Sequence, residues 1–322
     1  MGLGSAATRA HLPALNQLGN EFPVALVAAA DISRERRRHA ESLLPDTPLF
    51  ANASDMVATV GFDVLVIATQ PSAHAELIVL GVSNGKHVVC EKPLVLDYSQ
   101  HARVATVYRS RPDLALIPVH QYRYSPLWAL ISQWLSRLDR VGLPVTLEVE
   151  VERAGADPHA ASNWRTNVAA SGGMLADHGA HFLALAHSVS ADIAVTKASS
   201  TRDPTGVEFS HARARVGSGT LRLTTVNGTP NRSTQVRASL AGLALSWRDA
   251  EAQIGLHGHT LLHWRVASLS NRDYVDSLYV CLYRDMLANL GRANWRRART
   301  AEALAIGTAV VSMLEHTRGR VA

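Results

Sequence analysis

The sequence predicts an α/β protein with two parts: a doubly wound parallel sheet, and after it an α/β domain built on an open, mostly antiparallel sheet. Between residues 23 and 120, short apolar stretches such as VALVAAAD and DVLVIAT alternate with helical ones such as SRERRRHAESLL and HAELIVLGVSNG. That rhythm is typical of a parallel βαβ sheet. Beyond residue 140, VTLEVEVERAG, GVEFSHARARV and GTLRLTTVNG alternate apolar with polar residues, which indicates antiparallel strands with one covered face.

The change of rhythm places a domain boundary near residue 120, so we expect one domain over residues 1–120 and a second over 121–322. A length of 322 residues, 47% of them hydrophobic and 18% charged, suffices for two ordinary cores. The last fifty residues return to amphipathic helix, in DYVDSLYVCLYRDMLANL and TAEALAIGTAVVSMLEHTRG. These helices can pack back on the first domain.

Composition narrows the functional classes. The chain has no run of about 18 apolar residues and no secretory signal, which disfavours membrane insertion and export and makes the cytoplasm the expected compartment. The net charge of +5 comes from Arg residues spread along the chain, so nucleic acid is not an expected partner. Cys90 and Cys281 each lie in an apolar run and are expected to be buried free thiols.

The opening MGLGSAATRAH contains the pattern G-x-G-x-x-A of a dinucleotide phosphate loop, with Gly2, Gly4 and Ala7 at its fixed positions, and the helix TRAHLPALNQLG is expected to follow it. The expected cofactor contacts of this loop are Gly2, Gly4, Ser5 and Ala6. Such a loop follows a strand, and Met1 alone precedes Gly2. We therefore expect the first strand to be missing from this chain and the natural protein to begin upstream, with an apolar β-branched stretch.

Asp31 ends the second predicted strand. There its carboxylate can accept both ribose hydroxyls of a dinucleotide and repel a 2′-phosphate, which favours NAD over NADP. Asp31 can also cap the helix that follows, and Arg34 or Arg36 can bind the 2′-phosphate instead, so NADP remains possible.

The stretch GKHVVCEKPLVLD runs a buried strand into Glu91, Lys92 and Pro93, which places Lys92 at the carboxyl edge of the sheet, where open α/β folds bind ligands. The chain has only three lysines, and elsewhere Arg fills its basic positions. Because Lys can exchange a proton and Arg cannot, Lys92 is a candidate acid or base. The alternative is a surface Lys paired with Glu91.

The stretch SGGMLADHGAHFLALAH predicts a helix that carries Asp177 and His181 four residues apart, on one face. His is the usual proton carrier, and a carboxylate nearby can orient it. The alternative is a structural pair. His178 and His187 lie on other faces, and the third ligand of a zinc site is lacking, so no metal is expected.

In chain order, GLGSAA, AAD, IATQPSAH, GKHVVCEKP, HQYRYSP and WRTNVAASGGMLADHGAH resemble the glucose-fructose oxidoreductase, inositol dehydrogenase and MocA family. The resemblance covers nearly the whole chain. It implies an N-terminal Rossmann domain, a C-terminal α/β domain whose open sheet commonly mediates homodimer or homotetramer contacts, and a nicotinamide between the two domains. The implied cofactor is NAD, with NADP possible.

The resemblance also implies roles for single residues. The catalytic group would be Lys92, Asp177 and His181. Gln70 stands where the family commonly has Pro, a mild departure. The remaining implied contacts are Thr69, Pro71, His74, Glu91 and Gln121 to the cofactor, and Arg123, Trp164 and Arg165 to the substrate.

The function that follows is hydride transfer between a nicotinamide and a secondary alcohol or ketone of a sugar, cyclitol or related polyol. One alternative keeps the site without net redox, because transient oxidation can acidify a neighbouring C–H for epimerisation or elimination. The other alternative is a regulator that binds the dinucleotide without turnover.

Overall fold

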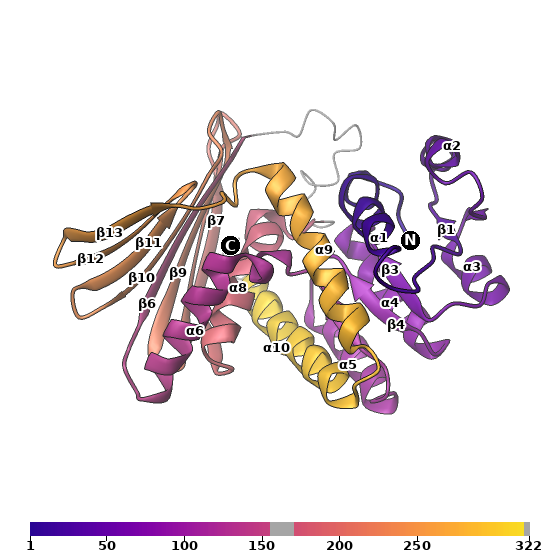
Figure 1. Cartoon of the computed structure of the whole chain (residues 1–322). Coiled ribbons are helices and arrows are strands. Elements are labelled where there is room, and N and C mark those ends of the chain that lie inside the picture. Colours follow the sequence, from indigo (N-terminus) through magenta and orange to yellow (C-terminus); the bar gives the residue numbers. More distant parts are fainter. Residues whose placement is uncertain (155–170, 319–322) are drawn as a thin grey trace. The chain divides into compact units, whose positions relative to one another are not determined.

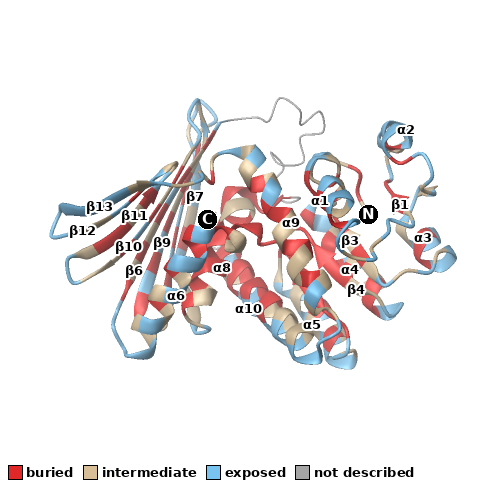
Figure 2. Ribbon diagram, viewed as in Figure 1, coloured by how far each residue is buried: buried red, intermediate tan, exposed pale blue. Residues whose placement is uncertain are grey.

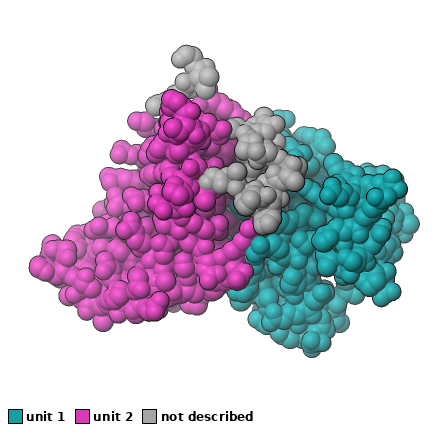
Figure 3. Space-filling model, turned by 90° about the horizontal axis from the view of Figure 1, so that it is seen from above, with its two compact units in different colours: residues 1–121, 276–304 teal, residues 122–275, 305–322 magenta. Residues whose placement is uncertain are grey.

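The computed structural model describes residues 1–154 and 171–318, which divide into two compact units (Figure 3). Unit 1 is Met1–Gln121 with Asp276–Leu304, and unit 2 is Tyr122–Val275 with Ala305–Ala322. The first boundary lies one residue beyond the expected position at 120. Asp276–Leu304, from the C-terminal helices, groups with unit 1.

Two helices each contribute to both units. α9 (Arg272–Asn289) starts in unit 2 and continues in unit 1, whereas α10 (Ala293–Arg318) starts in unit 1 and ends in unit 2 (Figure 1). None of the described helices has the length and apolar character that a membrane span requires.

Unit 1 contains two small parallel sheets in its described residues. One has the order β3-β4-β5 and the other pairs β1 with β2. Buried positions predominate in the three-stranded sheet (Figure 2), as expected for parallel strands with helices on both faces. The strands are β1 (Ala29–Ala30), β2 (Leu49–Phe50), β3 (Val64–Ile67), β4 (His87–Cys90) and β5 (Leu116–Pro118).

The backbone of Met1 and Gly2 lies between these two sheets and bonds to both. On one side the Gly2 N–H donates to the Ala30 carbonyl at 2.8 Å. On the other side the Met1 amino group donates to the Val66 carbonyl at 2.8 Å, and the Ala68 N–H donates to the Met1 carbonyl at 2.8 Å. The position between β1 and β3, which a central strand fills in a doubly wound sheet, is thus taken by two residues.

The expected strand VALVAAAD is much shorter than predicted. Only Ala29 and Ala30 pair as a strand, because Met1 and Gly2 reach only the end of this segment on its β3 side. The preceding Leu26 and Val27 are 37% and 42% exposed.

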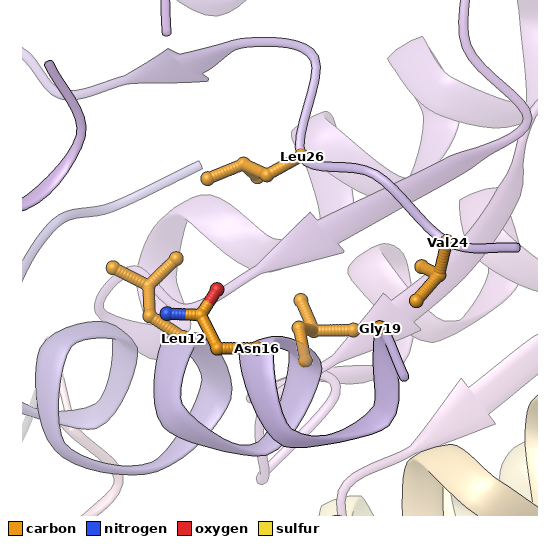
Figure 4. A pocket seen from close by; sticks show the side chains of 6 residues that line it. Leu12, Asn16, Gly19, Val24 and Leu26 are labelled. Atoms are coloured by element: carbon orange, nitrogen blue, oxygen red, sulfur yellow. The ribbon is translucent and has the colours of Figure 1, made fainter. Parts of the chain in front are cut away.

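A pocket of about 220 Å³ lies between this segment and α1 (Leu12–Leu18) (Figure 4). None of the residues predicted to contact cofactor or substrate lines it. Its lining is Leu12, Leu15, Asn16, Gly19, Val24 and Leu26.

The first helix is present as predicted, but it contains a π-helical turn, Ala7–His11, directly before α1. Pro13 explains the turn: it has no N–H to offer, and its ring crowds the carbonyl four residues earlier, so the helix widens ahead of it. The Leu12 N–H accordingly donates to the Ala7 carbonyl, five residues back. Within this turn His11 is only 2% exposed.

The remaining helices of unit 1 connect the strands. Ser33, Asn52 and Asp97 each cap a helix by accepting the N–H three residues later. The sequence pattern predicted helices at α2 and α4. It did not predict α3 and α5, because these segments lack a long apolar periodicity. The bounds are α2 (Arg34–Leu43), α3 (Ala53–Thr59), α4 (His74–Ser83) and α5 (Tyr98–Ser110).

Within the described part of unit 2, eight strands form one sheet in the order β13-β12-β11-β10-β6-β9-β8-β7 (Figure 1). Every pair is antiparallel except β6 with β9, which confirms the predicted mostly antiparallel sheet. The strands β7, β12 and β13 were not anticipated. The bounds are β6 (Thr146–Ala154), β7 (Ile193–Arg202), β8 (Glu208–Val216), β9 (Gly219–Thr229), β10 (Ser233–Leu240), β11 (Leu243–Arg248), β12 (Glu251–Leu256) and β13 (His259–Arg265).

One face of this sheet is covered by helices. On β6, Leu147, Val149 and Val151 are buried while Glu150 between them is exposed. α8 (Gly173–Val189) packs on β6, β8 and β9, and α6 (Pro126–Arg140) packs on α8. The α/β organisation predicted for the C-terminal domain is therefore confirmed.

Gly2→Ala tests the junction of Met1 and Gly2. Gly2 has φ +81°, and a Cβ there would lie 2.6 Å from the Ala68 carbonyl oxygen. We expect the free energy of unfolding to fall by about 1–3 kcal/mol, as is usual for a strained left-handed residue. Urea denaturation measures it. Gly61→Ala is the control, since a Cβ at Gly61 meets nothing within 4 Å. Equal effects of the two substitutions would contradict this account of Gly2.

Candidate active site

The predicted phosphate loop follows Gly2 and opens the first helix. The Leu3 N–H donates to Asp31 Oδ2 at 2.7 Å, and the Gly4 carbonyl accepts the Thr8 N–H at 3.1 Å. The Asp31 carboxylate and the first turn of the helix therefore both hold the backbone of this loop. Ser5 and Ala6 start this turn, where backbone N–H groups have no partner within the helix and can face an anion.

Asp31 lies at the end of β1 and is 6% exposed. Besides Leu3, it binds the Ser33 N–H through Oδ1 at 2.8 Å. It does not cap α2 as the sequence analysis allowed, because the Ser33 hydroxyl accepts the Arg36 N–H. The Arg36 guanidinium lies 3.7 Å from Asp31 Oδ2 and remains 43% exposed. A cation thus stands beside the carboxylate that was predicted to select NAD.

The loop after β3 carries Thr69, Pro71 and His74. Pro71 starts a short 3-10 helix, and His74 is fully buried below it. His74 Nδ1 lies 2.8 Å from the Pro93 carbonyl oxygen and Nε2 lies 3.1 Å from that of Thr69. Burial lowers the pKa of His74, against hydrogen bonds to both carbonyls that favour the protonated ring. His74 therefore ties the predicted cofactor loop to the segment after Lys92.

Lys92 is the second residue after β4, following Glu91, and is half-buried. Its backbone N–H donates to Glu91 Oε2 at 3.2 Å. The Glu91 carboxylate turns into unit 1: Oε1 accepts the Tyr279 hydroxyl at 2.6 Å and lies 3.2 Å from His11 Nε2. Both oxygens of Glu91, predicted as a cofactor ligand, are thus engaged by the protein.

Glu91 is charged although it is buried. Burial by itself raises the pKa of this carboxyl, but the hydrogen bond and charge of His11, the charge of Lys92 and the Tyr279 hydroxyl outweigh it and hold the pKa at about 2. Neighbouring Cys90 is also buried, and burial raises the pKa of its thiol, which favours the inert protonated form. Cys281 is half-buried, less than expected.

In unit 2, α8 carries the second predicted motif. The helix starts after Gly172, whose φ of +75° is a left-handed conformation suited to glycine. His181 is 2% exposed, and its ring stacks on Tyr122 with 4.1 Å between centroids and 15° between planes. Asp177 Oδ2 lies 3.7 Å from His178 Nε2, although His178 was placed on another face. The side chain of Asp177 is 21% exposed, more than that of His181.

Tyr122 is the residue around His181 that the sequence analysis missed. Its ring also meets Trp128 and Phe182 edge-on, with centroids 6.0 Å and 6.3 Å away. Tyr122 lies in the sequence QYRYSP, between Gln121 and Arg123, which were predicted to contact cofactor and substrate. Gln121 is 5% exposed and is the last residue of the N-terminal segment of unit 1. Arg123 belongs to unit 2, where its guanidinium carbon lies 5.9 Å from the Tyr124 ring centroid.

The candidates thus fall into two groups, the cofactor loops with Lys92 in unit 1, and Asp177 with His181 in unit 2. Trp164 and Arg165 lie outside the described residues. Among the residues that are described, no three His, Cys, Asp or Glu side chains gather in a way that could hold a metal ion.

The charge on Glu91 predicts an acid-sensitive stability. The pKa of Glu91 is about 2 in the folded protein, against an ordinary 4.5. A lowered pKa stabilises the folded state above pH 4.5, and this contribution is lost as the pH falls toward 2. We expect the difference in unfolding free energy between wild type and Glu91→Gln to shrink by about 3 kcal/mol from pH 5 to pH 2.

Urea denaturation at a series of pH values measures this difference. The control is Glu76→Gln, which removes an exposed carboxylate of α4, and its pH series gives the background for the Glu91 variant. A difference for Glu91→Gln that varies with pH no more than this background would contradict the assignment of a buried charge.

Comparison with known proteins agrees with this arrangement. Residues 1–117 match the sequence model of a family described as "Oxidoreductase family, NAD-binding Rossmann fold". An oxidoreductase of Schizosaccharomyces pombe is 25% identical over 185 residues, which are 57% of this chain and 49% of that protein. An inositol 2-dehydrogenase of Acidiphilium cryptum is 28% identical over 89 residues, 28% of this chain and 26% of that one. The chain thus spans half or less of the length of these curated relatives.

Solved structures match the fold over the whole chain. A 3-ketoreductase from Actinomadura kijaniata, in complex with NADP and TDP-benzene, has a TM-score of 0.76 at 19% identity and covers 99% of this chain and 95% of its own. A myo-inositol 2-dehydrogenase from Lactobacillus plantarum has a TM-score of 0.72 at 18% identity, with coverages of 98% and 95%. Residues 1–117 thus match the NAD-binding Rossmann part of this oxidoreductase family, and nearly the whole chain shares its fold with these solved structures.

Proposed function

We propose that this protein transfers a hydride between a nicotinamide cofactor and a secondary alcohol or ketone of a sugar, cyclitol or related polyol. The observation that carries the proposal is the glycine loop of unit 1, held between β1 and β3 with Asp31 and Arg36 beside it. The half-buried Lys92 follows the neighbouring strand β4. Ligands of open α/β sheets bind at this carboxyl edge.

The loop fits the pyrophosphate of a dinucleotide. A Cβ on Gly2 would collide with the Ala68 carbonyl, whereas a Cβ on Gly4 would meet only the Arg36 guanidinium, 3.7 Å away. Gly4 therefore leaves its backbone open to a close-approaching anion, and the first helical turn from Ser5 and Ala6 follows directly. Asp31 would hold the ribose hydroxyls, since each carboxylate oxygen keeps a lone pair beyond the backbone bond it accepts.

The loops after β3 and β4 would hold the nicotinamide end. Thr69, Pro71 and Gln121 would contact it directly. His74 and Glu91 are buried under these loops, and we propose that they position them instead. When bound, the nicotinamide supplies the acceptor or donor of the hydride.

Three side chains of this chain would handle the proton. His181 would take the proton of the substrate hydroxyl, Asp177 would orient the imidazole and stabilise its charged form, and Lys92 would bond the same oxygen and stabilise charge that develops there. The stack of His181 on Tyr122 supports this role, because it limits the ring to one plane before substrate arrives.

The substrate class rests on the relatives. Among the similar proteins are inositol 2-dehydrogenases and a 3-ketoreductase crystallised with a TDP-containing ligand. Arg123 of unit 2, with Trp164 and Arg165, would contact the polyol. We also propose a homodimer or homotetramer formed through the face of the unit 2 sheet that α6 and α8 leave uncovered.

Lys92→Arg tests whether Lys92 takes part in proton transfer as well as bonding the substrate oxygen. The guanidinium keeps the charge but cannot exchange a proton near neutral pH, so we expect kcat to fall by about 10²-fold or more. The assay follows the absorbance of reduced cofactor against a panel of polyols, keto sugars and nucleotide sugars. Lys197→Arg, an exposed residue of β7, is the matched control and should keep wild-type kcat.

Wild-type turnover by the Lys92→Arg protein would remove Lys92 from the mechanism. His181→Ala should likewise abolish turnover while it leaves cofactor affinity nearly intact. Product formation without any net change in reduced cofactor would favour the epimerase or eliminase alternative.

The cofactor preference tests Asp31 and Arg36. We propose NAD as the better cofactor, because the Asp31 carboxylate repels a 2′-phosphate at close range. Arg36 beside it would support the remaining use of NADP, so Arg36→Ala should lower kcat/KM for NADP about tenfold and change that for NAD little. Arg38→Ala, at an exposed position of the same helix, is the control. A tenfold preference of the wild type for NADP would overturn this part of the proposal.

A further inference from the structure

Four polar side chains meet in the interior of unit 1. They come from three segments far apart in the sequence, namely the first helix, the end of β4 and α9. None is more than 8% exposed. They are His11, Glu91, Tyr279 and Tyr283.

Their hydrogen bonds form one chain that ends on the Glu91 carboxylate. Tyr283 Oη lies 2.6 Å from His11 Nδ1, His11 Nε2 lies 3.2 Å from Glu91 Oε1, and the Tyr279 hydroxyl donates to the same oxygen at 2.6 Å. The His11 ring also stands edge-on to Tyr279, with 4.9 Å between centroids and 82° between planes.

The Glu91 carboxylate decides which groups in this chain of hydrogen bonds donate. A carboxylate only accepts, so the His11 Nε2–H and the Tyr279 hydroxyl both donate to Glu91 Oε1. Burial raises the pKa of both tyrosines, so their hydroxyls stay protonated and able to donate. The second oxygen of Glu91 accepts the backbone N–H of Lys92, so the chain of bonds passes from α9 to Lys92.

The π-helical turn places His11 in this cluster. Ala7–His11 begins one residue after the loop segment Gly2–Ala6, and π turns are rare and frequently lie at functional sites. The same short helix thus carries the glycine loop at its start and a donor to Glu91 at its π turn.

A stabilising role alone accounts poorly for the cluster. Replacing buried ionic groups by apolar side chains of similar volume is often neutral or stabilising. The charged Glu91 directly precedes Lys92, and its partner His11 lies on the helix that follows the glycine loop. The proposed function places these two segments, the loop and Lys92, against the cofactor.

We propose that His11, Glu91, Tyr279 and Tyr283 are positioning residues that fix the backbone of Lys92 and the glycine-loop helix against each other, with α9 as the common support. This inference rests on the proposed function for the chemistry that the two segments perform. Surface ion pairs hold the same part of α9 to the first helix and the segment after it, Asp276 with Arg9 and Arg284 with Glu21.

Tyr279→Phe tests the proposal, because it removes one hydroxyl and keeps the ring. Tyr108→Phe is the matched control: Tyr108 is also buried in unit 1, and its hydroxyl donates to the Ala115 carbonyl at 3.1 Å, away from this cluster. A merely structural role predicts similar losses of Tm and unchanged kcat in both variants.

We expect Tyr279→Phe to lower kcat about tenfold with substrate KM within twofold, and to raise the Kd of NAD severalfold, measured without substrate by quenching of tryptophan fluorescence. Tyr108→Phe should change neither. His11→Gln, which can place an amide N–H near the position of Nε2, should retain more activity than His11→Leu.

Equal kcat and Kd in the Tyr279 and Tyr108 variants, or equal activity of His11→Gln and His11→Leu, would overturn the positioning role. A wild type that binds NAD but turns over no substrate would overturn the proposed function alone. In that case the Kd comparison still decides the positioning role.

Discussion

A buried carboxylate that stays ionised requires hydrogen-bond donors on every side, and unit 1 is organised around one. Glu91 receives the Tyr279 hydroxyl, the His11 ring and the backbone N–H of Lys92. Without these donors the charge would cost several kcal/mol in an apolar interior. One of these donors, Tyr279, lies on α9, which follows the long sheet of unit 2 in the sequence. Its bond to Glu91 connects α9 to the end of β4.

At the edge of unit 1 that we propose to bind cofactor, buried side chains connect the loops by hydrogen bonds to their backbone. Asp31 joins the glycine loop to the start of α2, and His74 joins the loop after β3 to the segment after Lys92. Each tie is a side chain with little exposure that binds backbone groups of two segments. Such bonds hold a binding edge in one geometry before a ligand arrives, which lowers the ordering cost of binding.

The two groups of candidate residues lie in different surroundings. Lys92 follows an ionised carboxylate in a polar cluster, whereas His181 lies in an aromatic setting of Tyr122, Trp128 and Phe182. An imidazole stacked on the Tyr122 ring and 2% exposed keeps a fixed plane and little access to bulk water. A lysine beside a negative charge keeps a cation near the oxygen on which charge would develop. The roles that we propose, proton acceptor for His181 and charge stabilisation for Lys92, agree with these different surroundings.

The local sequence was sufficient for patterns whose cause is local. Alternating residues predicted β6, β8 and β9 of unit 2, and the order of apolar runs predicted β3, β4 and the helix α4, because the apolar pattern of each segment shows whether one face or both are buried. The motifs around Lys92 and His181 were likewise visible. The partners of those motifs were not, since Tyr279 lies 188 residues from Glu91 and Tyr122 lies 59 residues from His181. The length of β1 was also decided in three dimensions: VALVAAAD has the composition of a strand, but a strand needs neighbours. Within the described residues, its end pairs with β2 on one side and reaches Met1 and Gly2 on the other. Hydrogen bonds between distant segments depend on how the chain folds back, and only the tertiary structure decides which donor reaches which acceptor.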